Sequence, residues 1–140
     1  MHGRILEILK IAGAAVRSKV FEELRRSGTD VLSAVYKEGE DDTIYQIDRN
    51  VEEILVPILE PFAHEMGGFL LLAEGIGDPV TGLRLGGEEG KVPSWAILID
   101  PIDGTRGIMY NKRPAFFLAG AALYQTELRL KDIEVACMTE

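Results

Sequence analysis

Hydrophobic residues recur at helical spacing at the start of the chain, with charged residues at the positions between them. The recurring apolar positions are Ile5, Leu9, Ala12, Val16, Val20 and Leu24. This arrangement is typical of an amphipathic helix that buries one face. We therefore expect a helix from about Arg4 to Arg26, ended by Ser27 and Gly28.

Short apolar runs separated by a charged turn come next. Residues 31–36 favour a strand, the acidic run 38–42 a turn, and residues 43–47 the returning strand of a hairpin. A second amphipathic helix is expected near Asp48, which is well placed as its N-cap. Pro57 predicts either a kink in this helix or a later first turn, because proline lacks the backbone N–H.

Two short runs in the middle of the chain are apolar on both faces and end in an acid. Residues 69–73 lead into Glu74, and residues 95–99 lead into Asp100. Such runs are typical of buried strands, so we expect each to present a carboxylate at its end. Between them, residues 75–94 carry six glycines and two prolines with little periodicity, which predicts a surface excursion. Two more strands are expected at 115–124 and 128–138.

Length, charge and cysteine content exclude several classes of protein. The 140 residues fit one domain, and a net charge of -8 opposes binding to nucleic acid. Every apolar run is far shorter than the roughly 20 residues of a membrane helix, so no membrane span is predicted. The single cysteine, Cys137, excludes an internal disulfide and fits a reducing compartment. We expect a cytoplasmic protein without a secretory signal.

The second acidic strand end continues as Asp100-Pro101-Ile102-Asp103-Gly104-Thr105. Pro101 is expected to fix a turn that lets both aspartates point into one space, and Gly104 lets a ligand approach the backbone. Carboxylates held this close repel each other unless a cation lies between them. Mg²⁺ suits such a site, because it takes oxygen ligands and shares its shell with substrate phosphate. The N–H groups of Gly104 and Thr105 could then hold a phosphate.

Two other phosphate-handling motifs do not fit the chain. A haloacid dehalogenase phosphatase needs a nucleophilic aspartate where this chain has Pro101, which cannot attack phosphorus. Residues 86–91 have the spacing of part of a phosphate loop, but Leu85 and Val92 stand where glycine and Ser or Thr are required. The glycines of residues 86–91 are therefore interpreted as ordinary loop glycines.

The hexapeptide at 100–105 resembles the most specific motif of the Mg²⁺-dependent, lithium-sensitive phosphatases, which include inositol monophosphatase and fructose bisphosphatase. Glu74 resembles the metal-bridging glutamate of that family, although Ala73-Glu74-Gly75 stands where Gly-Glu-Glu is usual. Asp48 resembles the aspartate that pairs with the motif threonine. After Thr105 the chain departs from the usual Asn-Phe, which indicates a divergent branch.

The resemblance implies hydrolysis of a small phosphate monoester by a metal-activated water, with two or more Mg²⁺ ions as cofactor. It assigns catalytic roles to Asp48, Glu74 and Thr105, and phosphate binding to Gly104 and Thr105. The implied metal ligands are Glu74, Asp100, the Ile102 carbonyl and Asp103. The substrate is a small phosphorylated metabolite: an inositol phosphate, a sugar bisphosphate or a nucleotide bisphosphate.

The same resemblance implies an α+β fold in which two long helices pack on a mostly antiparallel sheet. This is the N-terminal half of the layered sugar-phosphatase fold, so residues 1–140 are expected to form a single phosphatase-like domain that is incomplete at its C-terminus. The family's C-terminal half supplies a further metal-binding aspartate, so we expect that half or a homo-oligomeric partner to complete the site. The alternative is a non-catalytic metal- or phosphate-binding half-domain that needs a second segment or partner.

Overall fold

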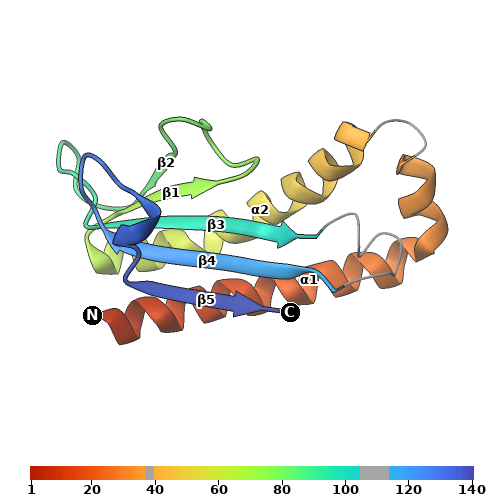
Figure 1. Ribbon diagram of the computed structural model, residues 1–140, viewed down its shortest axis with the longest axis horizontal. Coiled ribbons are helices and arrows are strands. Elements are labelled where there is room, and N and C mark those ends of the chain that lie inside the picture. Colours follow the sequence, from red (N-terminus) through yellow and green to blue (C-terminus); the bar gives the residue numbers. More distant parts are fainter. Residues whose placement is uncertain (37–39, 105–113) are drawn as a thin grey trace.

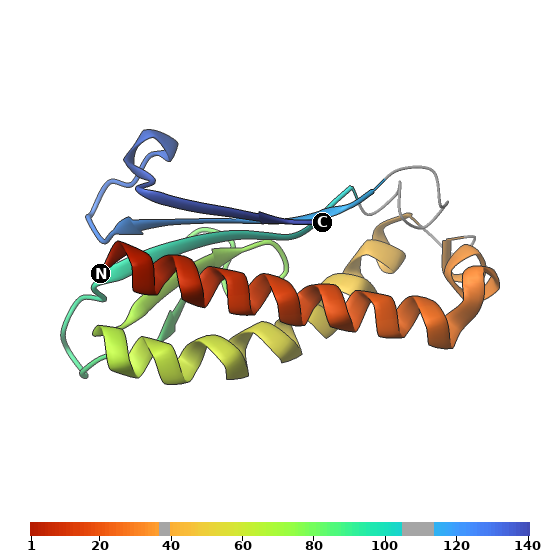
Figure 2. The same ribbon diagram turned by 90° about the horizontal axis from the view of Figure 1, so that it is seen from below.

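Two helices and a five-stranded sheet make up the described chain. The computed structural model describes the backbone of residues 1–36, 40–104 and 114–140, and their side chains except at 23–24, 26–36 and 40–51. The elements are α1 (His2–Tyr36), α2 (Glu40–Met66), β1 (Phe69–Ala73), β2 (Leu83–Leu85), β3 (Trp95–Asp103), β4 (Phe116–Leu123), the 3₁₀ helix η1 (Leu130–Asp132) and β5 (Val135–Thr139). Both helices lie on one face of the sheet (Figures 1 and 2). The predicted α+β class is confirmed.

The sheet is mixed, with one parallel pair. Its strand order is β2-β1-β3-β4-β5. β1 and β3 run parallel, while β1 with β2, β3 with β4, and β4 with β5 are antiparallel. The expectation of a mostly antiparallel sheet is therefore confirmed. The parallel pair brings the carboxyl ends of β1 and β3 to the same edge.

The core lies between the sheet and the two helices. Along β3, Trp95, Ile97 and Ile99 alternate toward the helices and are almost fully buried, as the pleat of a strand requires. The helices contribute a matching set of buried apolar side chains: Ile5, Ile8, Leu9, Ala12 and Val16 from α1, and Leu55, Leu59 and Ala63 from α2. The predicted apolar stripe at the start of the chain is thus the buried face of α1. Neither helix, over its described residues, is long and apolar enough to cross a membrane.

The predicted hairpin before the second helix is wrong. Helix α1 continues through Ser27 and Gly28 to Tyr36, so residues 31–36 are helical and not a strand. Helix α2 already begins at Glu40, so residues 43–47 are also helical, while 37–39 lie outside the described residues. Short apolar runs fit a helix as well as a strand, and one interior glycine costs a helix only about 1 kcal/mol. Pro57 and Pro61 both lie inside α2, so the first turn does not start later.

Two further predictions about the strands need correction. The glycine-rich excursion at 75–94 contains strand β2, which pairs with β1 from Phe69↔Leu85 to Leu71↔Leu83. The strand expected over 128–138 is confined to Val135–Thr139, and η1 occupies part of the remainder. Both errors concern weak periodicity, where pairing with a neighbouring strand decides the structure more than the local pattern does.

Gly86 is where the excursion packs against α2. It has φ +57°, and an added Cβ would lie 2.6 Å from the carbonyl carbon of Ala63 and 2.6 Å from the nitrogen of His64. Backbone atoms of a packed helix cannot yield to such a contact. Glycine is therefore required at position 86, because two backbone segments approach each other closely there. The sequence does not distinguish Gly86 from the other glycines of the excursion.

We expect Gly86→Ala to lower the free energy of unfolding by about 3 kcal/mol, the upper range for overpacking. Gly90→Ala is the matched control, because Gly90 has φ +80° but no atom within 4 Å of an added Cβ. It should cost only about 1 kcal/mol, from backbone strain alone. Urea denaturation of both variants measures the difference, and equal losses would show that the contact with α2 is unimportant.

Candidate functional site

The two acidic strand ends lie side by side. In the parallel pairing of β1 with β3, Ala73 is in register with Ile99. Glu74 is the first residue after β1, and Asp100 is the next residue of β3. The two residues therefore lie at the same end of two neighbouring strands. Glu74 is exposed and Asp100 is half-buried. The topology thus puts two carboxylates, 26 positions apart in the sequence, at neighbouring strand ends.

Strand β3 continues beyond β1, which changes the expected role of Pro101. Asp100 pairs with Leu118 and Asp103 with Phe116, with a register shift between them. Pro101 lies in this irregular segment, past the last residue of β3 that pairs with β1. Proline cannot donate a hydrogen bond to a neighbouring strand. It is tolerated in this segment because a residue at a strand bulge or at an unpaired strand edge has no such bond to make. The prediction of a turn is therefore wrong: Pro101 occupies an irregular part of a strand.

Asp100 is electrostatically coupled to the other two acids. Its pKa is raised above the ordinary value, first by desolvation on burial and then by the negative charges of Asp103 and Glu74. A hydrogen bond from the backbone N–H of Ile102 to the Asp100 carboxylate acts in the opposite direction and lowers the pKa. Repulsion among the three carboxylates means that the site favours either a proton or a cation.

The N–H of Ile102 is an addition to the predicted site groups. The sequence predicts only that the carbonyl of Ile102 binds the metal. In the structure, the N–H of Ile102 donates a hydrogen bond to the Asp100 carboxylate. An aspartate followed by proline is a signal for such a bond, since aspartate side chains often accept from the N–H two residues ahead. The Ile102 side chain is 7% exposed, which anchors this backbone segment in the core.

The chemistry of the donors fits Mg²⁺ better than a softer metal. Glu74, Asp100 and Asp103 offer hard carboxylate oxygens. Among the described residues, no group of three or more His, Cys, Asp or Glu is close enough to hold a metal ion by itself. Mg²⁺ does not require such a cage, because it retains several waters and commonly uses one or two carboxylates together with substrate phosphate.

Gly104 follows the last acid in a conformation that other residues rarely adopt. Its φ is +92°, and an added Cβ would lie 3.3 Å from the Pro114 carbonyl oxygen. The predicted need for glycine at this position therefore has a backbone cause. Thr105, its predicted partner in phosphate binding, lies outside the described residues.

Asp48 lies within α2, which begins at Glu40. The interpretation of Asp48 as a helix N-cap is therefore wrong, because a capping residue stands at the first turn. Its side chain is outside the described set. The pairing of Asp48 with Thr105 stays a prediction, and the acids that the structure brings together are Glu74, Asp100 and Asp103.

Comparison with known proteins finds similarity only among solved structures. No family profile and no curated protein matches the chain. One similar structure is a crystal structure of extragenic suppressor protein SuhB from Bartonella henselae solved with iodide phasing, at 21% identity and a TM-score of 0.46. The native crystal structure of the same protein has 19% identity and a TM-score of 0.48.

The similarity covers most of this chain but a minority of its counterpart. In both comparisons 86% of this chain is covered, against 39% and 41% of the SuhB chains. The chain thus spans about two fifths of the length of the structures it resembles.

Proposed function

We propose that the protein is a phosphatase of the inositol monophosphatase type, which hydrolyses a small phosphate monoester with Mg²⁺. The observation that carries this proposal is the placement of Glu74 and Asp100 at adjacent parallel strand ends, with Asp103 close enough to raise the pKa of Asp100. The hexapeptide at 100–105 supports the same function. An inositol phosphate, a sugar bisphosphate and a nucleotide bisphosphate are the proposed substrate classes.

The three carboxylates would hold the metal. Glu74 and Asp100 would hold one Mg²⁺ ion, and Asp100, Asp103 and the Ile102 carbonyl would hold a second. The hydrogen bond from the Ile102 N–H to the Asp100 carboxylate supports its ionised form, the form that a metal ligand needs. When bound, Mg²⁺ neutralises phosphate charge and lowers the pKa of a water molecule.

The residues after Asp103 would position the phosphate and the water. Gly104 carries no side chain that would shield its N–H from a phosphate oxygen. The Thr105 hydroxyl and the Asp48 carboxylate would orient the attacking water and accept its proton. Neither step requires a covalent bond between the protein and phosphorus.

The test is phosphate release by the full-length protein from inositol 1-phosphate and from fructose 1,6-bisphosphate, with Mg²⁺ and with EDTA. We expect turnover of at least one ester that stops with EDTA and returns when Mg²⁺ is added in excess. Turnover that persists in EDTA would contradict the proposal. Binding of Mg²⁺ without turnover of any phosphate ester would instead support the non-catalytic half-domain.

A further inference from the structure

A histidine, a tryptophan and a glutamate from three separate parts of the chain meet at the start of α1. His2 is the first residue of the helix, Trp95 is the first residue of β3, and Glu134 immediately precedes β5. His2 Nε2 lies 2.5 Å from a carboxylate oxygen of Glu134, and the His2 and Trp95 rings meet edge to face with centroids 5.8 Å apart. We call these three residues the His2 cluster. It lies at the end of β3 opposite the acids at 100–103, so it is separate from the candidate site.

Trp95 contains a buried hydrogen-bond donor that is not used. The residue is 1% exposed, and its indole Nε1 has no hydrogen-bond partner among the described residues. A buried N–H without an acceptor costs free energy, and folded proteins pair nearly all such groups. The His2 ring, which contacts the indole, is placed to supply an acceptor.

The protonation state of His2 decides whether it can supply that acceptor. A protonated imidazole has two N–H donors and no acceptor, whereas a neutral imidazole has one of each. The protonated ring therefore suits the contact with the Glu134 carboxylate and leaves the Trp95 N–H without a partner. Loss of one proton to solvent turns a ring nitrogen of His2 into an acceptor.

Glu134 is the charged group that contacts His2 directly. Other charged or titratable groups lie a few residues from the His2 cluster along the chain, or at the end of α2 that α1 contacts: the Met1 amino group, Arg4, Glu7, His64, Glu65, Lys91, Tyr124, Lys131 and Asp132. The Arg4 guanidinium pairs with the carboxylates of Glu7 and Glu65, so these three charges offset one another. Histidine is the side chain that ordinarily changes charge between about pH 5 and pH 8.

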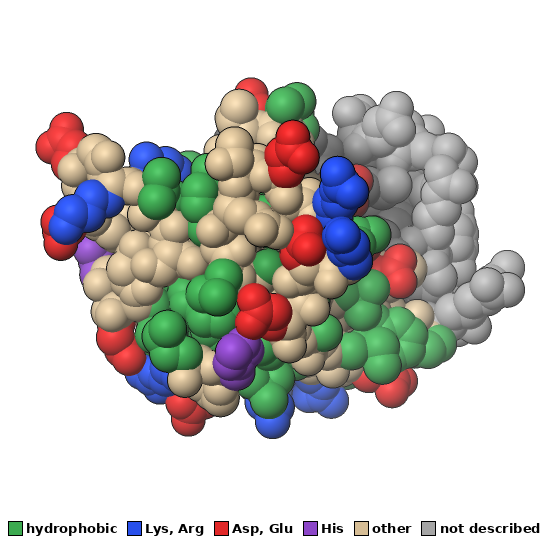
Figure 3. All heavy atoms as spheres, turned by 60° about the vertical axis from the view of Figure 1, so that its left-hand side comes forward, with side chains coloured by type: hydrophobic (Ala, Val, Ile, Leu, Met, Phe, Trp, Pro, Cys, Tyr) green, Lys and Arg blue, Asp and Glu red, His purple; other side chains and the backbone are tan. Residues whose placement is uncertain are grey.

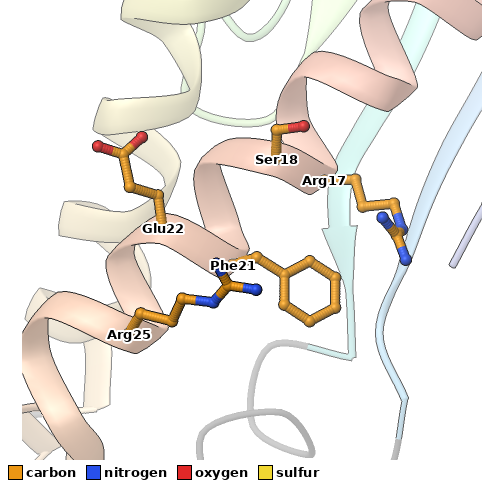
Figure 4. Close-up of a pocket in the computed structure, with 5 residues that line it drawn as sticks. All are labelled: Arg17, Ser18, Phe21, Glu22 and Arg25. Carbon is orange, nitrogen blue, oxygen red and sulfur yellow. The ribbon is translucent and has the colours of Figure 1, made fainter.

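Solvent protons reach the His2 cluster through His2 and Glu134, whose side chains are 59% and 37% exposed. Figure 3 turns this end of the molecule forward and shows histidine side chains at the surface beside acidic ones. Farther along α1, a cavity of about 530 Å³ is lined by Arg17, Ser18, Phe21, Glu22 and Arg25 (Figure 4). Because none of these described lining residues is a histidine, a response to pH is expected at the first turn of α1 and not at this cavity.

We propose that His2 is a pH-dependent switch that exchanges Glu134 for Trp95 as its partner. At low pH the protonated ring pairs with the Glu134 carboxylate and ties the first turn of α1 to the segment before β5. At higher pH the ring gives up one proton to solvent, and the freed nitrogen accepts the Trp95 N–H, which ties the same turn to β3. The buried indole donor is thus satisfied only when His2 is neutral.

NMR spectroscopy of the full chain tests the switch directly, because the single tryptophan gives one indole N–H signal. We expect this proton signal to move downfield as the pH rises from about 5 to about 8, since a proton moves downfield when it enters a hydrogen bond. His2→Phe keeps an aromatic ring but removes both nitrogens, so its indole signal should stay near the low-pH position. His64→Phe is the matched control, because it changes the other histidine, which is exposed on α2, and it should titrate like the parent.

Two further variants separate the new hydrogen bond from the ion pair. Glu134→Gln removes the ion pair but keeps the imidazole acceptor, so the downfield movement should persist. His2→Gln offers an amide oxygen at every pH, so its indole signal should stay near the high-pH position of the parent. The backbone amide signals of each variant check that it folds.

Three results would overturn the switch. The first is an indole signal of the parent that does not move downfield with rising pH. The second is a movement that persists in His2→Phe, because another group would then cause it. The third is a movement that disappears in Glu134→Gln, because the signal would then report the loss of the ion pair and not a bond from Trp95 to His2.

Discussion

Replacement of Thr105 by alanine is expected to lower kcat of the full-length protein by about 10²- to 10⁴-fold, the usual contribution of a positioned acid-base group. The substitution keeps the backbone N–H that would hold phosphate and removes the hydroxyl that would orient water. The loss therefore falls on the transition state more than on substrate binding, and KM should change little. Steady-state kinetics at saturating Mg²⁺ measure both constants.

Thr126→Ala is the matched control for this experiment. Thr126 is exposed in the segment after β4, and its loss should leave kcat unchanged. If kcat of Thr105→Ala stays within about twofold of the parent, far below a catalytic contribution, the threonine has no part in activating water. The role assigned to Asp48 would then fall as well, because the two residues are proposed to act together.

Asp100→Asn is expected to have opposite effects on metal binding and on apo stability. The loss of a direct ligand charge should weaken Mg²⁺ binding by about 100-fold or more, since even supporting groups cost 10- to 100-fold. Without metal, the variant should melt at a higher temperature than the parent at pH 7. The pKa of Asp100 is raised in the folded chain, so its ionisation opposes folding, and asparagine removes that charge.

Calorimetric Mg²⁺ titration and thermal melts in EDTA make both measurements. Glu89→Gln is the control, because it removes one exposed carboxylate charge from the 75–94 excursion and should change neither quantity. An apo melting temperature of Asp100→Asn that falls below the parent would mean that the Asp100 carboxylate, through its bond from Ile102, stabilises the fold. Unchanged Mg²⁺ affinity would remove Asp100 from the proposed ligands.

The two central strands could be predicted from the sequence because their residues strongly favour a buried strand. Residues 69–73 and 95–99 are apolar on both faces, and the structure places both in the middle of the sheet. The first helix was also predictable, since its apolar stripe continues over several turns. The strand at 115–124 corresponds closely to β4. In these segments local pattern and tertiary packing favour the same structure.

The segment from 27 to 47 could not be assigned in the same way. Its apolar residues occur in short runs that suit either a strand or one face of a helix, and the structure extends α1 and α2 through most of it. Strand β2 escaped prediction for a different reason. Its three residues pair with β1, and no local period can show a partner elsewhere in the chain.

The candidate site was predictable as a set of residues but not as an arrangement. The sequence shows acids at two strand ends, but it does not show that β1 and β3 are parallel neighbours. If the strands ran antiparallel, Glu74 and Asp100 would lie at opposite edges of the sheet. The pairing of Ala73 with Ile99 decides this point, and it depends on the chain crossing back through the 75–94 excursion.

The central claim is that Glu74, Asp100 and Asp103 bind one cluster of divalent cations, and paramagnetic Mn²⁺ tests it most directly. Mn²⁺ uses the same kind of oxygen ligands as Mg²⁺ and broadens the NMR signals of nearby amides. Titration of the isotopically labelled chain should broaden the amides of Glu74, Asp100 and residues 102–104 together, with one midpoint, and excess Mg²⁺ should restore them. Broadening of one strand end without the other, or broadening that Mg²⁺ does not reverse, would contradict a shared magnesium site.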